Sequence, residues 1–490
     1  MKNLTDRNQR IDIEIQNEGT FSLEKGENVL SVLTEQGFFE VSHCGGHGTC
    51  GKCVVRFLQG APLPMPADRR RFSPQELRDG FRLACMAKPR QSCRIELCVQ
   101  REEMFIMDRA LCGEEMLPGG EPGEGTETAG GHEETLIVTD LGTTTMVLLL
   151  VEKKTGRIID TMKKLNPQQK YGADVVSRMQ ASVSGKKSEL SDLVKRDMEK
   201  AVTEWRAKGY EPERMVLSGN TVMVHLLMEY DVIGLSKAPF TPVTTSSVCY
   251  DIGGIQGKTV PGISAFVGGD VVAGMLVCRR LMQEDGTSCA LLVDLGTNGE
   301  MVLFTEKGNW CTATAAGPAF EGGFGGRMYG TDVIAAVAEL LKKEIADETG
   351  LMKEPYFSEG FTEDKMSIRQ ADIRHLQEAK AAVFAGIRIL MEEAGVSGED
   401  IGHVYLAGGF GYRLNVEAAC EIGLIPVSFK KKTTAVGNTA LAGGYLYDLT
   451  DDVQVREMIK NTKSINLAEK EHFNDYYLRA MELRGESDFT

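Results

Sequence analysis

The chain of 490 residues lacks a long apolar segment and an excess of basic residues. Its most apolar stretch, residues 136–151, is broken by Asp140 and by threonines, whereas a membrane-spanning helix needs about 18 or more apolar residues in a row. Residues 1–6 contain no apolar core of a secretory signal, so we expect a cytoplasmic protein with no membrane partner. The net charge of −15 argues against nucleic acid as the main partner.

Histidine is scarce, and the cysteines are not spread as in a disulfide scaffold. The seven histidines show neither an H-E-x-x-H motif nor paired ligand spacing, so we assign no zinc site to them. Twelve cysteines in a chain of this length do not suggest a secreted, disulfide-rich protein. Several of them cluster with glycine instead, which favours a metal centre.

The cluster is a glycine-rich loop at residues 42–53, with the sequence SHCGGHGTCGKC. Glycine lets a loop curl around a ligand and point its N–H groups inward. Three clustered cysteines and a distant fourth are the plant-type ligand pattern of a 2Fe-2S cluster, although the first gap here is five residues and not four. We therefore predict Cys44, Cys50, Cys53 and Cys85 as ligands. Zinc or disulfides are the alternatives, but zinc usually binds paired cysteines, and only Cys50 and Cys53 form a C-x-x-C pair.

Alternation of apolar and polar residues around this loop predicts a β-grasp order of elements. We expect strands at residues 11–16, 20–23, 54–58 and 93–99, and helices at residues 27–36 and after Ser73. Cys93 shares a face of the last strand with Ile95 and Leu97, which predicts a core residue and not a ligand. His43 and His47 flank the loop but are not needed as ligands. Cys98 and Cys112 are expected to be spare thiols. The first hundred residues resemble 2Fe-2S ferredoxins.

Residues 101–134 contain the clearest domain boundary, because residues 113–134 are rich in glycine and glutamate. Such a segment cannot bury enough apolar surface to order itself. A flexible linker of this length spans on the order of 25 Å. We expect the cluster domain to swing on it.

Beyond the linker the sequence repeats itself. LIVTDLGTT at residues 136–144 is echoed by LLVDLGTN at residues 291–298, and a second apolar strand follows each copy, at residues 146–151 and 301–304. Two hairpins of one design predict two similar lobes. Helical patterns at residues 173–182 and 190–208 alternate with a strand pattern at residues 215–218, which indicates α/β layers. The second lobe shows a long helical pattern from residue 367 or 369 to residue 393, a buried strand from residue 404 that ends in glycines, a helix that opens at residues 437–444, and a charged helical tail from residue 450.

A strand that ends in Asp-Leu-Gly-Thr places a tight turn whose N–H groups can bind phosphate oxygens. The adjacent carboxylate can hold Mg²⁺, usually through water. Two such turns and Gly408-Gly409 resemble the acetate and sugar kinase, heat-shock protein 70 and actin superfamily (ASKHA), which implies ATP binding. The resemblance implies Asp140 and Asp294 as the catalytic carboxylates, two phosphate loops and an adenosine contact. The implied nucleotide residues are Gly142, Thr143, Thr144, Gly296, Thr297, Asn298, Gly408 and Gly409. The alternative is a duplicated domain that has lost its nucleotide.

Three further motifs stay without an assigned role. A glycine-rich run at residues 315–327 carries Glu321 and Arg327, which could contact a partner or the nucleotide, or simply lie in a loop. Gly219-Asn220-Thr221 and Gly268-Gly269-Asp270 each open a predicted helix, so their polar residues are expected to be caps. Asp270 beside phosphate is the less favoured interpretation.

A ferredoxin-like loop fused to ASKHA motifs resembles the reductive activators of corrinoid-dependent enzymes. The resemblance implies a multidomain α+β and α/β protein. Its expected parts are a β-grasp 2Fe-2S domain (1–100), a linker (101–134), a two-lobed actin-like ATPase domain (135–450) and a helical tail on or near it (451–490). It also implies ATP, Mg²⁺ and a 2Fe-2S cluster as cofactors, and one-electron reduction of cob(II)alamin to cob(I)alamin. The implied partners are a corrinoid protein of a methyltransferase system and a low-potential electron donor.

Other functions remain open on the sequence. An activator of a 2-hydroxyacyl-CoA dehydratase also joins this ATPase fold to iron–sulfur chemistry, although those activators resemble proteins with a bridging 4Fe-4S cluster. A small-molecule kinase could use Asp294 as its carboxylate but leaves the ferredoxin part unexplained. A redox sensor would use the cluster to gate binding without turnover.

Overall fold

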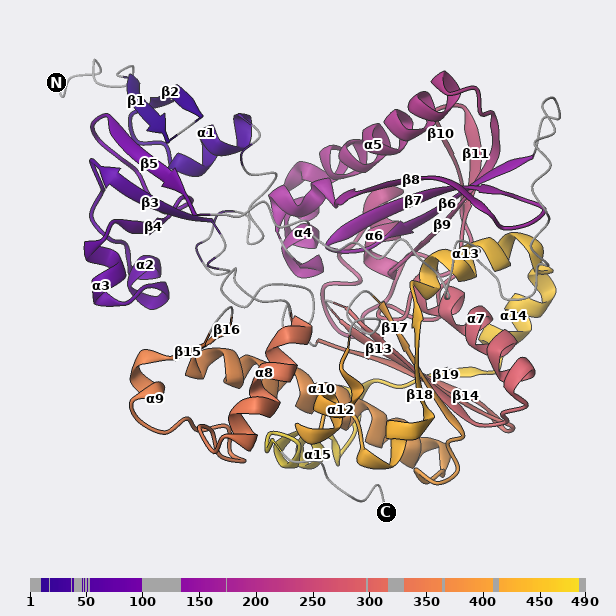
Figure 1. The fold of residues 1–490 in the computed structure, drawn as a ribbon. Coiled ribbons are helices and arrows are strands. Elements are labelled where there is room, and N and C mark those ends of the chain that lie inside the picture. The colour runs from indigo at the N-terminus through magenta and orange to yellow at the C-terminus, as the bar shows by residue number, and fades with distance from the viewer. Residues whose placement is uncertain are drawn as a thin grey trace, which may run out of the picture. The chain divides into compact units, whose positions relative to one another are not determined.

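The computed structural model describes most of the chain, and these residues form two compact units (Figure 1). The described residues are 10–16, 18–36, 38, 46, 48, 51, 53–98, 134–172, 174–296, 298–315, 330–363, 366–408 and 414–483. Residues 1–104 and 167–178 make up the first unit, and residues 105–166 and 179–490 the second. Among the described residues, no helix combines the length and the apolar character needed to cross a bilayer.

The first unit contains a five-stranded sheet with three short helices. Its elements are β1 (Arg10–Ile15), β2 (Gly19–Glu24), α1 (Val29–Glu35), β3 (Val54–Gln59), α2 (Pro66–Arg71), α3 (Pro74–Arg78), β4 (Phe81–Leu83) and β5 (Cys93–Leu97). The strand order is β2-β1-β5-β3-β4. Strands β1 and β5 are parallel, and the other neighbours are antiparallel. The predicted β-grasp order is confirmed, but α2 and β4 were not predicted.

The alternating pattern of β1 puts Ile11, Ile13 and Ile15 on the buried face of this sheet. Helix α1 covers that face with Val29 and Leu33, each fully buried. Cys93 belongs to the same core, and burial raises the pKa of its thiol to about 11. The prediction that Cys93 is a core residue is therefore confirmed.

The first lobe of the second unit is built on a six-stranded sheet. Its strands and main helices are β6 (Thr135–Leu141), β7 (Thr145–Glu152), β8 (Ile158–Leu165), α5 (Lys187–Ala207), β9 (Pro212–Gly219), α6 (Thr221–Leu227), β10 (Cys249–Ile252), β11 (Ile255–Thr259) and α7 (Gly269–Asp285). Between β8 and α5 the chain forms η1 (Pro167–Tyr171) and α4 (Val175–Ala181), of which residues 167–178 belong to the first unit, and then η2 (Ser182–Lys186). The strand order is β10-β11-β9-β6-β7-β8.

The second lobe is built on another six-stranded sheet. Its elements are β12 (Ala290–Leu295), β13 (Gly299–Thr305), β14 (Gly308–Thr314), α8 (Gly330–Lys342), α9 (Tyr356–Glu359), β15 (Phe361–Glu363), β16 (Met366–Ile368), α10 (Gln370–Ala394), β17 (His403–Ala407), α12 (Val416–Glu421), η4 (Val427–Lys432), β18 (Thr433–Gly437), α13 (Thr439–Leu449), α14 (Asp452–Lys460), β19 (Thr462–Ser464), η5 (Leu467–Glu469) and α15 (Phe473–Arg479). The strand order is β18-β17-β12-β13-β14-β19, and β15 pairs with β16 in a separate hairpin.

The two sheets share one topology, which confirms the predicted duplication. In each, three consecutive strands form an antiparallel meander, β6-β7-β8 or β12-β13-β14. The first strand of the meander then pairs in parallel with a later strand, β9 or β17, which pairs in parallel with β11 or β18. The sequence predicted only the first two strands of each meander.

The charged tail is not wholly helical as expected. Strand β19 adds to the edge of the second sheet, parallel to β14, with Asn309 opposite Thr462. The tail is also fixed further on, because the buried Lys380 of α10 donates to the Glu482 carbonyl at 2.6 Å and Gln377 donates to the Met481 carbonyl at 2.6 Å.

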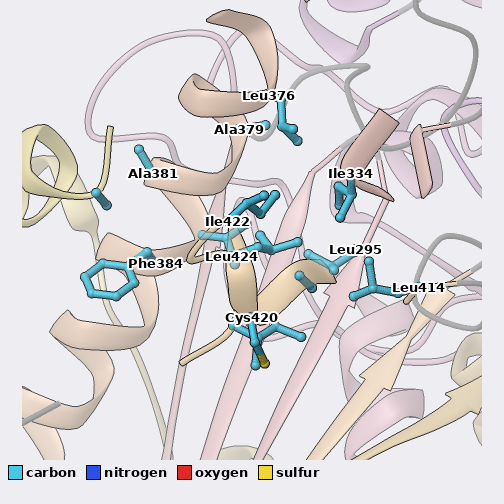
Figure 2. Packing of buried hydrophobic residues seen from close by; sticks show 14 of the residues in the cluster. Leu295, Ile334, Leu376, Ala379, Ala381, Phe384, Leu414, Cys420, Ile422 and Leu424 are labelled. Atoms are coloured by element: carbon cyan, nitrogen blue, oxygen red, sulfur yellow. The ribbon is translucent and has the colours of Figure 1, made fainter. Parts of the chain in front are cut away.

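The core of the second lobe lies between its sheet and helices α8, α10 and α12. Figure 2 shows Leu295 of β12 and Ile334 of α8 close to Ile422 and Leu424, which follow α12, with Leu376 of α10 nearby. All five are buried. This packing supports β12, the strand that carries the second Asp-Gly turn.

Helices α7 and α13 pack closely against each other and join the two lobes. Each follows the last parallel strand of its own lobe, β11 or β18. A Cβ atom on Gly443 of α13 would overlap the carbonyl oxygen of Ala273 in α7. A Cβ on the next residue, Gly444, would lie 2.9 Å from Val138 of β6. The sequence Gly443-Gly444 therefore lets α13 approach both α7 and the first sheet.

We expect Gly443→Ala to lower the free energy of unfolding by about 1–3 kcal/mol, because the methyl group meets fixed backbone of another helix. Gly386→Ala in α10 is the matched control, since its Cβ would meet the flexible end of the Met301 side chain. Chemical denaturation of both variants measures the difference. Equal losses would contradict the assignment of Gly443 as the contact between the lobes.

Candidate functional site

Two of the four predicted cluster ligands are described, and the fold brings them together. Cys53 directly precedes β3, and Cys85 follows β4, which pairs with β3 through Val54 and Leu83. The N–H of Ala84 donates to the carbonyl of Cys53 at 2.7 Å. The N–H of Cys85 donates to Cys53 Sγ at 3.5 Å. Both cysteines are buried, with 3% and 2% of their surfaces exposed.

The glycines of the cysteine loop have the backbone conformations that a tight loop needs. Gly46, Gly48 and Gly51 have φ angles of 86°, 69° and 67°, which other residues rarely adopt. A Cβ on Gly48 would lie 3.0 Å from both Ala67 of α2 and Met86, next to Cys85. Gly48 therefore lies between α2 and the turn that carries Cys85.

A buried carboxylate, that of Asp68, fixes the backbone that leads into the Cys85 turn and into α2 through hydrogen bonds. Asp68 of α2 is fully buried, and its oxygens accept from the N–H of Leu83 at 2.8 Å and of Met65 at 2.7 Å. Its neighbour Arg82, 5% exposed, donates to the Pro62 carbonyl at 2.9 Å. Nothing in the sequence pattern marked this pair, because a buried charge is recognisable only once its partners are known.

The described donors fit a 2Fe-2S cluster. Two buried thiols lie beside glycine-rich backbone, and an N–H group already points at one of the sulfurs. N–H donors to sulfur are a feature of iron–sulfur sites, where they tune the reduction potential. Cys44 and Cys50 lie outside the described residues, as do Cys112 and the two histidines of the loop. Their assignment stays a prediction.

The first Asp-Gly turn lies at the end of β6, where Asp140 is partly buried. A Cβ on Gly142 would lie 2.8 Å from the Thr145 carbonyl, so only glycine fits there. The fully buried Asn166 holds the turn through its amide, which donates to the Gly142 carbonyl at 2.7 Å, and through its N–H, which donates to the Thr144 carbonyl at 2.9 Å. Asn166 was not predicted.

Thr143 connects this turn to the neighbouring strand. Its hydroxyl accepts from the amide of Asn220 at 3.0 Å. Asn220 also caps α6, as predicted, by accepting from the N–H of Met223 at 2.9 Å. Because β6 and β9 are parallel, with Leu141 opposite Gly219, the turn and the start of α6 meet at one sheet edge.

The second turn repeats this arrangement at the end of β12. Asp294 is partly buried, and the N–H of Gly296 donates to the Asn298 carbonyl at 2.9 Å. Gly408, with a φ angle of 83°, lies over the strand end, because its Cβ would be 2.5 Å from Asp294 Oδ1 and 2.8 Å from the Leu295 carbonyl. The structure thus brings the predicted Asp294 and Gly408 together.

Asn438 links the two lobes at the first turn. Its amide donates to Asp140 Oδ2 at 2.8 Å, across 298 positions of sequence. Its Oδ1 accepts from the N–H of Leu441 at 3.0 Å and so caps α13. One side chain therefore fixes both the carboxylate of the first lobe and the helix that follows the second lobe's parallel strands.

Asp270 is not the cap that the sequence suggested. The N-cap of α7 is Gly268, without a side-chain cap bond, and Asp270 lies in the first turn. A Cβ on Gly268 would lie 2.5 Å from the Cα of Asn220, which places this helix start beside the Asn220–Thr143 pair. Burial raises the pKa of Asp270 to about 6. A carboxyl with such a pKa can exchange protons near neutral pH.

Helix α7 also reaches the second turn. Burial, reinforced by the Asp294 carboxylate, raises the pKa of the Cys278 thiol. Helix α7 of the first lobe is therefore near both strand ends. Four residues named in the sequence analysis lie outside the described residues: Thr297, Gly409, Glu321 and Arg327. The nucleotide-binding role of Thr297 and Gly409 stays a prediction, and Glu321 and Arg327 stay without an assigned role.

Two strand-end carboxylates, each beside a tight turn, form an arrangement that can bind a metal–nucleotide complex. A β-grasp domain with buried cysteines and a duplicated two-lobed domain define a class of ASKHA-type proteins that carry a ferredoxin domain.

Three family profiles match successive parts of the chain. A 2Fe-2S iron-sulfur cluster binding domain matches residues 13–90, the RACo middle region residues 136–283, and the C-terminal domain of RACo, the ASKHA domain, residues 288–328 and 326–489. The chain belongs to the RACo family, whose two domain models together match most of its residues from 136 to 489.

Relatives agree with this assignment. Corrinoid activation enzyme RamQ of Eubacterium limosum is 25% identical over 391 residues, which cover 64% of either chain. One component of the Na⁺-translocating NADH-quinone reductase of Yersinia enterocolitica is 34% identical over 102 residues, 21% of this chain and 24% of that protein. The chain thus spans less than two thirds of the length of these relatives. A solved reductive activator for corrinoid, iron-sulfur protein has the same fold, with a TM-score of 0.63, 22% identity, and coverage of 98% of this chain and 99% of that chain.

We expect Asn438→Asp to weaken ATP binding about fivefold, because a second carboxylate beside Asp140 adds roughly 1 kcal/mol of repulsion toward the phosphate oxygens of the nucleotide. The new carboxylate can still cap α13. Calorimetric titration with a non-hydrolysable ATP analogue and Mg²⁺ measures the effect. Asn28→Asp is the matched control, since Asn28 caps α1 in the same manner in the other unit. Equal affinities in all three proteins would show that the Asn438–Asp140 bond does not shape the site.

We expect Asp270→Asn to stabilise the protein at pH 7.5 and to have little effect near pH 3. The folded-state pKa of about 6 exceeds the ordinary value of 3.8, so the folded state loses stability as the pH rises from about 3.8 to about 6, and the loss is complete above that range. The gain at pH 7.5 is at most about 3 kcal/mol, since a pKa difference of one corresponds to about 1.4 kcal/mol. Denaturation at both pH values measures it. The exposed Asp192→Asn should show no such pH dependence.

Proposed function

We propose that the protein activates a corrinoid protein of a methyltransferase system by ATP-dependent reduction. In this reaction one electron passes to the cobalt of the partner, which converts cob(II)alamin to cob(I)alamin. The observation that carries the proposal is the combination, in one chain, of a buried Cys53–Cys85 pair with two Asp-Gly turns of one design. The first fits a redox centre and the second a nucleotide site.

Cys44, Cys50, Cys53 and Cys85 would hold the 2Fe-2S cluster. When bound, such a cluster supplies single electrons at low potential, near −400 mV in plant-type proteins. The N–H of Cys85, which points at Cys53 Sγ, stabilises negative charge on that sulfur. Because both thiols are buried, the protein also shields the sulfurs from water.

Asp140 and Asp294 would hold Mg²⁺, mainly through water, at the two strand ends. The N–H groups of the turns at Gly142 and Gly296 would bind phosphate oxygens without a side-chain charge. Thr143, Thr144, Thr297 and Asn298 add hydroxyl and amide groups to these turns. Gly408 and Gly409 would contact the adenosine, where the absence of side chains lets the ligand approach the backbone.

Nucleotide binding between the lobes would couple ATP to electron transfer. The lobes are joined by the α7–α13 contact and by the Asn438–Asp140 bond. A ligand held by both turns favours one angle between the lobes, and it can change the affinity for a partner only if that partner binds the two states differently. Each 100 mV of uphill one-electron transfer requires about 2.3 kcal/mol, which ATP can supply through such a change.

Residues 101–134 would serve as a linker between the cluster domain and the ATPase domain. A linker of this length and composition would let the cluster alternate between an electron donor and the corrinoid partner. Shortening it to a few residues tests this part of the proposal, because delivery of the electron should then stop.

We expect cob(I)alamin to form only when ATP is present. The experiment mixes the protein anaerobically with a cob(II)alamin-loaded corrinoid protein and a low-potential reductant, and follows the cobalt spectrum. Cys85→Ala and Asp294→Asn should each lower the rate at least about 100-fold, because the first removes a cluster ligand and the second the carboxylate beside the phosphates. Cys249→Ala and Asp192→Asn are matched controls at exposed positions.

The result that would contradict the proposal is an intact cluster with measurable ATP turnover but no cob(I)alamin from any of several corrinoid proteins. Turnover of ATP that depends on an added small-molecule acceptor would instead favour a kinase.

A further inference from the structure

The second half of the ferredoxin-like domain has a charge opposite to that of the chain as a whole. Residues 51–100 contain ten Lys or Arg residues and four Asp or Glu residues, whereas the full chain contains 55 and 70. Such a reversal is relevant to partner choice, since clustered surface charge steers the encounter of two proteins. Whether these cations act together depends on where they lie in the fold.

Five exposed cations of this segment have no ion-pair partner among the described residues, and one of them, Arg78 of α3, instead donates to Gln75. Arg69 and Arg70 lie on α2, and Lys88 and Arg90 lie in the turn that follows Cys85. By contrast, Arg56 and Arg94 pair with Glu96 and Glu14 on the sheet. Apart from Arg78, the cations without an ion pair therefore belong to α2 and to the Cys85 turn.

These two elements lie against the described glycines of the cysteine loop. Ala67 of α2 and Met86 of the Cys85 turn both lie 3.0 Å from the Cβ position of Gly48. The last residue of α2, Arg71, donates through Nε to the Gly51 carbonyl at 3.4 Å. The unpaired cations of α2 and of the Cys85 turn thus flank the part of the domain where the redox centre would lie closest to a partner.

An exposed apolar spot lies next to α2. Leu63 is 88% exposed and Met65 is 46% exposed, and both lie in a proline-rich segment that leads into the helix. The segment is held in place, because Arg82 donates to the Pro62 carbonyl at 2.9 Å and the N–H of Met65 donates to Asp68 at 2.7 Å. An exposed leucine on a fixed segment offers a preformed contact that costs little ordering on binding.

We propose that Arg69, Arg70, Lys88 and Arg90, with Leu63 and Met65, form the docking surface for an acidic low-potential electron carrier that reduces the cluster. A small apolar centre with a charged rim is typical of transient redox complexes, which bury little surface and dissociate quickly. The cationic rim selects an acidic partner of the flavodoxin or ferredoxin class by charge complementarity. This proposal rests on the proposed function, for which it names the donor side.

An electron donor fits this surface better than the corrinoid protein does. Coupling to ATP requires the acceptor to distinguish the nucleotide states, so the acceptor must contact the ATPase domain. A donor has no such requirement and needs only an approach to the cluster. All six residues of the proposed surface belong to the ferredoxin-like domain.

The test follows the bleaching of the cluster absorbance in a stopped-flow instrument, with the full-length holoprotein and a reduced flavodoxin at low ionic strength. We expect the double variant Arg69→Glu, Arg70→Glu to slow this second-order rate at least about tenfold, since reversed charges oppose the encounter. The rate for the unchanged protein should fall with added salt, and the rate for the double variant should not. Leu63→Gln should slow the reaction without changing its salt dependence.

Two controls separate docking from damage to the cluster. Photoreduced 5-deazariboflavin, an uncharged reductant, should reduce the double variant as fast as the unchanged protein. Arg70→Glu alone should slow reduction by flavodoxin, whereas Arg10→Glu, an equal charge change at exposed Arg10 on β1, should not. Equal effects of the Arg10 and Arg70 variants, or no effect of the double variant, would overturn the proposal.

Failure of this test is distinguishable from failure of the proposed function, because reduction of the cluster is measured without a corrinoid protein. If Arg69→Glu, Arg70→Glu leaves reduction by flavodoxin unchanged but blocks electron delivery to cob(II)alamin, the surface serves the acceptor and the donor assignment is wrong.

Discussion

The contact between α7 and α13 is the constraint on which the ATPase domain depends. A Cβ on Gly443 would overlap the Ala273 carbonyl oxygen, so the helices approach as closely as backbone allows. Each helix follows the parallel strands of one lobe, and the contact therefore fixes the separation of the two strand ends that carry Asp140 and Asp294.

The ferredoxin-like domain is stabilised by a different device, a buried carboxylate. Asp68 accepts backbone N–H bonds from Leu83, two positions before Cys85, and from Met65 in the proline-rich segment. A buried charge is tolerated only when its hydrogen bonds are complete. Asp68 thus sets the position of a predicted cluster ligand and of the exposed apolar spot together, and it explains how a short, strand-poor segment can present a fixed surface beside a redox centre.

The proposed function assigns two tasks, electron entry and nucleotide binding, to separate parts of the chain. In the proposed function, the duplicated lobes would bind one ligand between two similar turns, and Asn438 links one of these turns to the helix after the other lobe. The ferredoxin-like domain has its own core and its own charge distribution. Its segment 51–100 has an excess of basic residues, whereas the chain as a whole has an excess of acidic residues. Independent cores allow electron entry and nucleotide binding to be tuned by separate residues, and the proposed function requires both.

The sequence by itself determined the parts whose signals are local. Alternation marked β1, the two Asp-Gly turns marked the duplicated hairpins, and the spacing of cysteines marked Cys53 and Cys85 as a pair. Tertiary structure alone decided what depends on distant partners. Asn438 and Asp140 are 298 positions apart, and β19 is a three-residue strand in a charged tail that pairs with β14 at the edge of the second sheet. Local patterns record burial and turns, whereas a hydrogen bond between remote residues leaves no periodic trace in the sequence.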